Sequence, residues 1–246
     1  MGPTRASAGV NHPSGTCTKA INMNSPKYLL ALVALALASL FPALSHAANN
    51  RQQFVLVSEN FNNVAQLRNW ATVNNSNPPG QSWFQGNPGI FAAPTGPPSS
   101  YIAANFLSAA NGKGWIDNWL ITPEVTLFGP SMLSLFVRGD QAPGLRDTLE
   151  IRFSAEGAST DTSNFSTIIS TFGGLSQFPS TWQQLTANFD FTGTGRFAFR
   201  YVGDADASNY IGIDSVLIST VPEPGIYLML LAGLAALALR SRGRTQ

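Results

Sequence analysis

The chain has 246 residues and a formal net charge of +1. Residues 48–220 hold eight Lys/Arg and twelve Asp/Glu, a net of −4, so this part lacks the basic patch that nucleic-acid binding requires. The single cysteine, Cys17, and both histidines, His12 and His46, precede residue 48. If the N-terminal segment is removed, the remaining chain can form no disulfide, no His or Cys metal site, and no Ser-His-Asp or Cys-His catalytic group.

The N-terminal segment has the three parts of a secretory signal peptide. Lys27 precedes the apolar run 28–40, and a small-x-small sequence ends at Ala47. We therefore expect signal peptidase to cut between Ala47 and Ala48. Met23 opens a more regular positively charged start than Met1 does, and we expect translation to begin there.

Residues 48–220 are predicted to form an all-β domain, a jelly-roll-like β-sandwich. Every second residue of 148–154 is apolar, which is typical of a strand with one face in water. Further strands are predicted at 54–57, 81–84, 101–106, 115–122, 131–138, 181–189, 195–201 and 210–219. Residues 165–172 fit a strand or a helix. Residues 62–71 fit a short helix, with Leu67 and Trp70 packing inward.

The tail, residues 221–246, has three parts in a fixed order. It begins with a proline-rich motif made of Val221, Pro222, Glu223, Pro224 and Gly225. An uncharged apolar run, 226–239, is predicted to be a transmembrane helix, and a basic end, 240–246, follows. Fourteen helical residues span about 21 Å, less than the ~30 Å bilayer core, whereas nineteen residues counted from Val221 are enough.

This order of motif, apolar run and basic end resembles the PEP-CTERM sorting signal of Gram-negative bacteria, which is read by an exosortase. The resemblance implies that the tail enters the inner membrane transiently, with its arginines in the cytoplasm, and that the exosortase then cuts it. An ordinary membrane anchor is the alternative.

Residues 54–219 carry six short motifs in a characteristic order. The motifs are Glu59–Phe61, Asp117–Pro123, Leu133–Arg138, Leu149–Ser154, Phe199–Tyr201 and Tyr210–Val216. In this order they resemble the choice-of-anchor J domain, which is similar to cleaved-adhesin and MAM-type jelly rolls. The resemblance implies an exported surface or matrix protein.

The same resemblance implies a structural calcium ion between the first and last strands. Glu59 and Asp214 lie in the corresponding motifs and are the candidate ligands, because Ca²⁺ prefers carboxylate and carbonyl oxygens. Alternatively, each carboxylate caps a turn or pairs with an arginine. The segment 204–209 lacks the glycine and distal glutamate of an EF-hand and fits a polar turn better.

Exposed aromatic side chains are the candidate ligand-binding residues. Trp115 follows a Gly-Lys-Gly sequence and is the best candidate for stacking on a polysaccharide. Trp119 and Trp182 are expected in the core, since aromatic residues dominate such cores.

We interpret the chain as a non-enzymatic protein of the cell surface, outer envelope or extracellular matrix. Its expected partners are signal peptidase, the secretion machinery, the membrane and an exosortase; no cofactor other than Ca²⁺ is predicted. One alternative is a carbohydrate-binding or adhesin module. Another is a glycan hydrolase that uses Glu150 and Glu156 as paired carboxylates.

Overall fold

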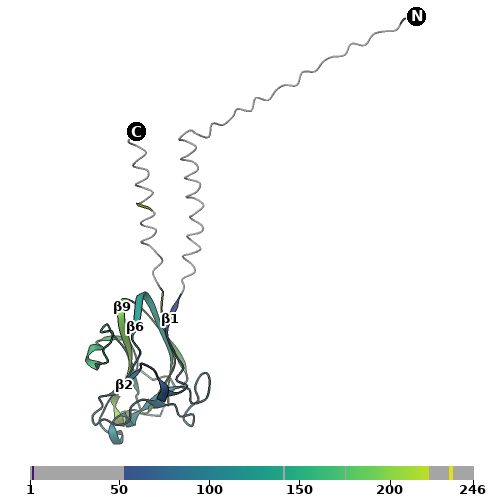
Figure 1. Cartoon of the computed structure of the whole chain (residues 1–246). Coiled ribbons are helices and arrows are strands. Elements are labelled where there is room, and N and C mark those ends of the chain that lie inside the picture. Colours follow the sequence, from purple (N-terminus) through teal and green to yellow (C-terminus); the bar gives the residue numbers. More distant parts are fainter. Residues whose placement is uncertain (1, 3–52, 141, 175, 222–232, 235–246) are drawn as a thin grey trace. The chain divides into compact units, whose positions relative to one another are not determined.

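The computed structural model describes residues 2, 53–140, 142–174, 176–221 and 233–234 (Figure 1). Residues 53–221 form an all-β domain. The predicted signal peptide, the cleavage site at Ala47 and Ala48, the motif residues 222–225 and nearly all of the predicted C-terminal helix lie outside the described residues. Within the described part of the chain, no helix has the length and apolar character that a membrane span requires.

The described residues contain ten strands, joined by turns and short 3-10 helices. The strands are β1 (Phe54–Glu59), β2 (Ala71–Asn74), β3 (Phe84–Gln85), β4 (Ile102–Asn105), β5 (Trp115–Ile121), β6 (Val125–Asp140), β7 (Thr148–Ser154), β8 (Thr167–Gly173), β9 (Gln183–Asp204) and β10 (Tyr210–Thr220). The 3-10 helices are η1 (Val64–Gln66), η2 (Phe106–Ser108), η3 (Ala110–Gly112), η4 (Thr162–Asn164) and η5 (Ala205–Ala207).

The strands form two antiparallel sheets that share β9. In the first sheet, residues 183–195 of β9 pair with β6, and β6 pairs with β10. The other edge of β10 pairs with β4 along its first half and with β1 along its second half. In the second sheet, residues 196–204 of β9 lie between β5 and β7, with β2 and β8 at the edges.

A single large core lies between the two sheets, as expected for a β-sandwich. Alternate residues of the strands face it, because side chains in a strand point to opposite faces in turn. Fully buried members from both sheets include Leu120, Leu133, Leu135, Ile151, Phe197, Phe199 and Ile213. The predicted all-β class is therefore confirmed, and the curled arrangement of the strands around this core agrees with a β-sandwich.

Several predicted elements differ from the observed ones. The helix predicted over 62–71 is wrong: only η1 is helical there, and Asn69 has a φ of 63°, which a right-handed helix does not tolerate. Leu67 and Trp70 nevertheless pack against the core as predicted. Residues 167–173 form a strand, and the two strands predicted over 181–201 are one continuous strand, β9.

Candidate functional site

The first and last strands bring Glu59 and Asp214 to the same region of the first sheet. β1 and β10 pair antiparallel, and Glu59 lies opposite Val216, two residues beyond Asp214. The pairing of β10 with β6 is irregular between Asp214 and Leu217, where Ser215 adopts a positive φ of 52°. Such an irregularity redirects side chains locally. The predicted pairing of the first and last strands is confirmed, and it places both residues near the junction of β1 and β10.

The Asp214 carboxylate is fully buried, and only one of its two oxygen atoms accepts a hydrogen bond from the described residues. Its Oδ1 atom accepts the Ser215 N–H at 2.6 Å, whereas its buried Oδ2 atom has no hydrogen-bond partner among the described residues. Burial raises the pKa of the Asp214 carboxyl to about 7; the hydrogen bond from Ser215 opposes the rise, and the charge of Glu59 adds to it. A buried carboxylate oxygen without a protein donor is satisfied by a proton, a water molecule or a cation.

The surroundings of Glu59 determine which cation would fit. Its Oε1 atom accepts the Phe61 N–H at 2.8 Å, and the Phe61 carbonyl accepts from Gln85 at 2.8 Å. Across the described residues, no three His, Cys, Asp or Glu side chains are grouped to hold a metal ion. Glu59 and Asp214 are therefore the two carboxylates that could take part in a Ca²⁺ site, for which carbonyl groups and water would have to supply the other ligands.

Trp115 lies at the beginning of β5 and is 55% exposed. It pairs with Asp204 of β9 and forms an isolated bridge with Asn77. Phe106 and Leu107 of η2 are also exposed, and η2 contacts β5. The predicted exposure of Trp115 is thus confirmed, and an exposed indole ring of this kind can stack on a sugar ring.

Four other large aromatic side chains are mostly covered. Trp83, Trp119 and Tyr210 are buried, and Trp182 is half-buried, with its indole N–H donating to the Ala92 carbonyl at 2.7 Å. Trp119 faces outward from the second sheet, but Phe165 covers it, with ring centroids 6.0 Å apart. Its predicted burial is confirmed, although the side chain lies in a small satellite cluster and not between the sheets.

Glu150 belongs to an ion-pair network that covers Trp119. Its Oε2 atom accepts from Arg152 at 2.7 Å and from Arg200 at 3.1 Å, and Arg200 also donates to Asp117 at 2.6 Å. Burial opposes the ionisation of Glu150, but hydrogen bonds from the two arginines outweigh it and lower the pKa of this carboxyl. A general acid needs a raised pKa, so this environment does not suit a glycosidase acid.

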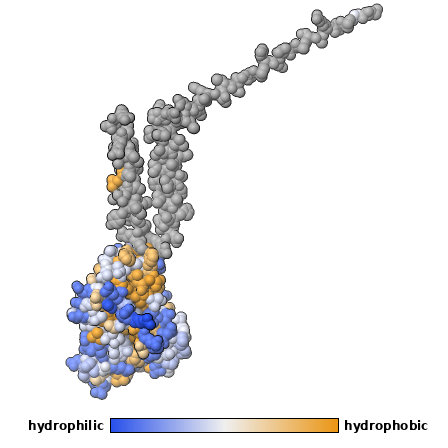
Figure 2. All heavy atoms as spheres, viewed as in Figure 1, coloured by the Kyte–Doolittle hydropathy of each residue, from blue (hydrophilic) through white to orange (hydrophobic). Residues whose placement is uncertain are grey.

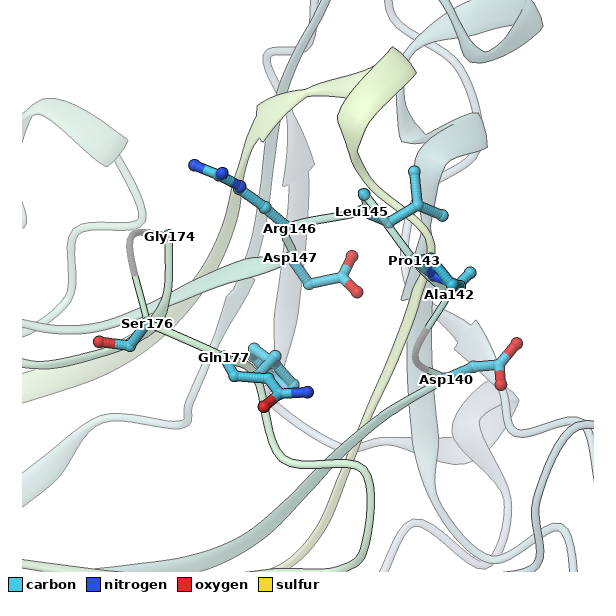
Figure 3. A pocket seen from close by; sticks show the side chains of 11 residues that line it. Asp140, Ala142, Pro143, Leu145, Arg146, Asp147, Gly174, Ser176 and Gln177 are labelled. Atoms are coloured by element: carbon cyan, nitrogen blue, oxygen red, sulfur yellow. The ribbon is translucent and has the colours of Figure 1, made fainter.

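Two loops line a pocket of about 520 Å³ (Figure 3). One loop joins β6 to β7, and the other follows β8. The Asp147 carboxylate points into it, whereas the side chain of Arg146 points away. Asp147 is buried, and its Oδ1 atom accepts from Tyr201 Oη at 2.5 Å and from the Asn209 N–H at 2.8 Å. Burial raises the pKa of Asp147, and these two hydrogen bonds oppose the rise.

Sequence reasoning missed Asp147, because its partners lie 54 and 62 residues away. Both of its hydrogen bonds connect neighbouring segments of the domain. The carboxylate therefore holds this end of the sandwich together. The segment 204–209, in turn, is a polar turn as predicted: Asp204 accepts from the Asp206 N–H at 3.0 Å, and Asp206 pairs with Lys113 at 2.8 Å.

The described domain is similar in fold to domains of known structure. No protein-family model and no curated protein sequence matches the chain. The K3 cleaved adhesin domain of Lys-gingipain from Porphyromonas gingivalis W83 is similar, with a TM-score of 0.55, 22% identity, and coverage of 69% of this chain and 99% of that domain. The K1 cleaved adhesin domain of the same protein is similar with a TM-score of 0.52 and 24% identity, and the match covers 68% of this chain and 97% of that domain. At identities this low, the structural match establishes a shared fold only, so the function has to be argued from the site.

Proposed function

We propose that this chain is an exported binding protein, of adhesin type, that works at the cell surface or in the extracellular matrix and carries out no catalysis. The likeness of its sandwich to cleaved adhesin domains is the observation that carries this proposal. The sandwich is of jelly-roll type and, by its motifs, of the choice-of-anchor J kind. Its acidic balance and its lack of a basic patch agree with an extracellular module.

Export and sorting belong to the two ends of the chain. Residues 1–47 direct export, and the tail 221–246 holds the protein in the inner membrane until an exosortase cuts it. Prolines at 222 and 224 disfavour a helix on both sides of Glu223, which suits recognition in a protease cleft. The carboxylate of Glu223 can then pair with an arginine of the enzyme.

A tag at each end of the chain tests the sorting proposal in a host that contains an exosortase. The wild type should lose the C-terminal tag and reach the surface or the matrix. Glu223→Ala should keep this tag and stay in the inner membrane, and Arg244→Lys, which preserves the positive end, should behave as the wild type. If mature surface protein still carries the C-terminal tag, the tail is an ordinary anchor.

Polysaccharide is the ligand class that the exposed indole of Trp115 favours. A glycan array probed with the exported protein should give binding that Trp115→Ala removes. Ile168→Ala is a matched control, because Ile168 is similarly exposed but lies on the edge strand β8. If Trp115→Ala binds the same glycans as strongly as the wild type, Trp115 does not contact the ligand.

Calcium is proposed as a structural ion held by Glu59 and Asp214. Binding would supply a partner for the buried Oδ2 atom of Asp214 and would balance the two neighbouring negative charges. This ion would stabilise the junction of β1 and β10. It has no direct part in ligand binding through Trp115.

A further inference from the structure

Three large apolar side chains are exposed where β10 ends. Phe54 and Val55 begin β1, and Phe128 belongs to β6; their exposed fractions are 47%, 59% and 51%. Phe54 lies opposite Thr220, the last residue of β10, and the Phe128 N–H donates to Thr220 Oγ1 at 3.1 Å. These three residues, called the apolar rim, therefore lie around Thr220, at the end of β10. Figure 2 shows apolar residues gathered at this end of the domain.

The strands around the apolar rim carry almost no charge. The segments 54–57, 126–133, 187–194 and 217–221 contain one charged residue, Asp190. Ordinary soluble surfaces intersperse charges among exposed apolar residues, and a contiguous apolar area usually marks an interaction site. A partner of the apolar rim would therefore bind through apolar contacts with these side chains and not through ion pairs.

The chain leaves the sandwich at this rim and soon becomes strongly apolar. The Val221 N–H donates to the Pro130 carbonyl at 2.8 Å, which fixes the beginning of the tail beside Phe128. The uncharged run begins at Ile226, five residues later. Five extended residues reach at most about 18 Å. When the run is in the membrane, the rim cannot lie far from the lipid headgroups.

We propose that the apolar rim rests on the lipid bilayer while the tail is still attached. This proposal rests on the proposed function, because it requires the run 226–239 to be inserted. Phe54, Val55 and Phe128 enter the interfacial zone, where aromatic and aliphatic side chains leave water and no ion pair is needed. The contact holds residues 222–225 at the membrane surface, within reach of a membrane-embedded protease.

Fluorescence from single labelled cysteines tests this contact. The full chain carrying Cys17→Ser is expressed in a secreting host that lacks an exosortase and is reconstituted into vesicles of phosphatidylethanolamine and phosphatidylglycerol. A polarity-sensitive dye is attached at Phe128→Cys or, as the control, at Lys113→Cys, an exposed site two residues before β5. The label at position 128 should shift to the blue and lose most of its emission when the acyl chains are brominated.

The outcomes separate the two proposals. Equal quenching at positions 128 and 113 overturns the contact while leaving the anchored tail in place. If alkaline carbonate extracts the protein from the vesicles, both the inserted tail and the rim contact fail. If the blue shift at position 128 vanishes when each vesicle holds one protein, the rim contacts a second copy of the chain and not lipid. Val55→Cys should repeat the result of Phe128→Cys, which guards against a local effect of one substitution.

Discussion

Replacement of Asp214 by asparagine gives the sharpest test of the candidate calcium site. The substitution keeps the shape of the side chain and the acceptor for the Ser215 N–H, and it removes the negative charge. In the folded domain the pKa of Asp214 rises from 3.8 to about 7. At about 1.4 kcal/mol per pKa unit, the ionised carboxylate destabilises the metal-free domain by roughly 4 kcal/mol.

The direction of the pH effect follows from proton linkage. A carboxyl whose folded pKa is raised binds its proton more tightly in the folded state than in the unfolded state. The contribution of Asp214 to the stability of the metal-free wild type is therefore greatest below about pH 4 and is lost as the pH rises toward 7. Asp214→Asn carries no such charge, so its stability should change little over this range, and at pH 8 it should exceed that of the metal-free wild type.

Calcium should reduce this difference in stability. An ion that binds only the folded state adds about 2.7 kcal/mol at a concentration of one hundred times its Kd. For a domain of this size, that gain corresponds to a rise in Tm of roughly 5–10 °C. Wild type with Ca²⁺ should therefore gain stability at pH 8, whereas Asp214→Asn should respond weakly or not at all.

The assay is thermal unfolding of the exported protein at pH 5 and pH 8, with Ca²⁺, with Mg²⁺ and with a chelator. Asp190→Asn is the control, because Asp190 is an exposed carboxylate on β9 and should leave the calcium response intact. An identical Tm of metal-stripped and calcium-loaded wild type at pH 8 would refute the metal site. If the stabilities of the metal-free wild type and of Asp214→Asn differ by the same amount at pH 5 and at pH 8, the buried, unpaired carboxylate is refuted.

Three further predictions concern the core, the backbone and export. Trp119→Ala should lower the free energy of unfolding by roughly 3–5 kcal/mol, as measured by urea unfolding, because the side chain is buried. This loss is a large part of the roughly 5–15 kcal/mol that is typical of a domain. Gly173→Ala should destabilise far more than Gly144→Ala: both have a positive φ, but a Cβ at 173 would lie 1.8 Å from the Asp147 carbonyl oxygen, whereas at 144 it meets nothing within 4 Å. Sequencing of the exported protein should find Ala48 at its N-terminus; an uncleaved protein would contradict the signal-peptide interpretation.

Local alternation predicted the strands well where one face is buried and the other is in water. Residues 148–154 are the clearest case, and β7 has these bounds. The pairing of β1 with β10 was also predictable, because the first and last strands of such sandwiches are commonly neighbours. The orphaned Oδ2 atom of Asp214 was not predictable, since it depends on the irregular pairing next to Ser215.

The sequence was misleading where a glycine lies inside a strand, beneath an aromatic ring, and not in a turn. Gly193 and Gly195 separate two apolar segments and favour a turn by composition. Both lie inside the continuous strand β9, and a Cβ at 195 would lie 2.4 Å from the Phe153 ring. Glycine is needed there because an aromatic ring covers the backbone. Such a contact joins residues far apart in the sequence, so no local pattern reveals it.

The arrangement of the domain separates the proposed membrane contact from the proposed ligand contact. Phe128 lies opposite Thr192 of β9, and Trp115 lies opposite Asp204 of the same strand. Twelve residues of strand correspond to roughly 40 Å of chain at about 3.3 Å per residue. An exosortase substrate held at the membrane through the apolar rim would thus keep Trp115 free in solution. Ligand binding and tail processing are then independent, so Trp115→Ala should leave cleavage of the tail unchanged, and Glu223→Ala should leave glycan binding by the folded domain unchanged.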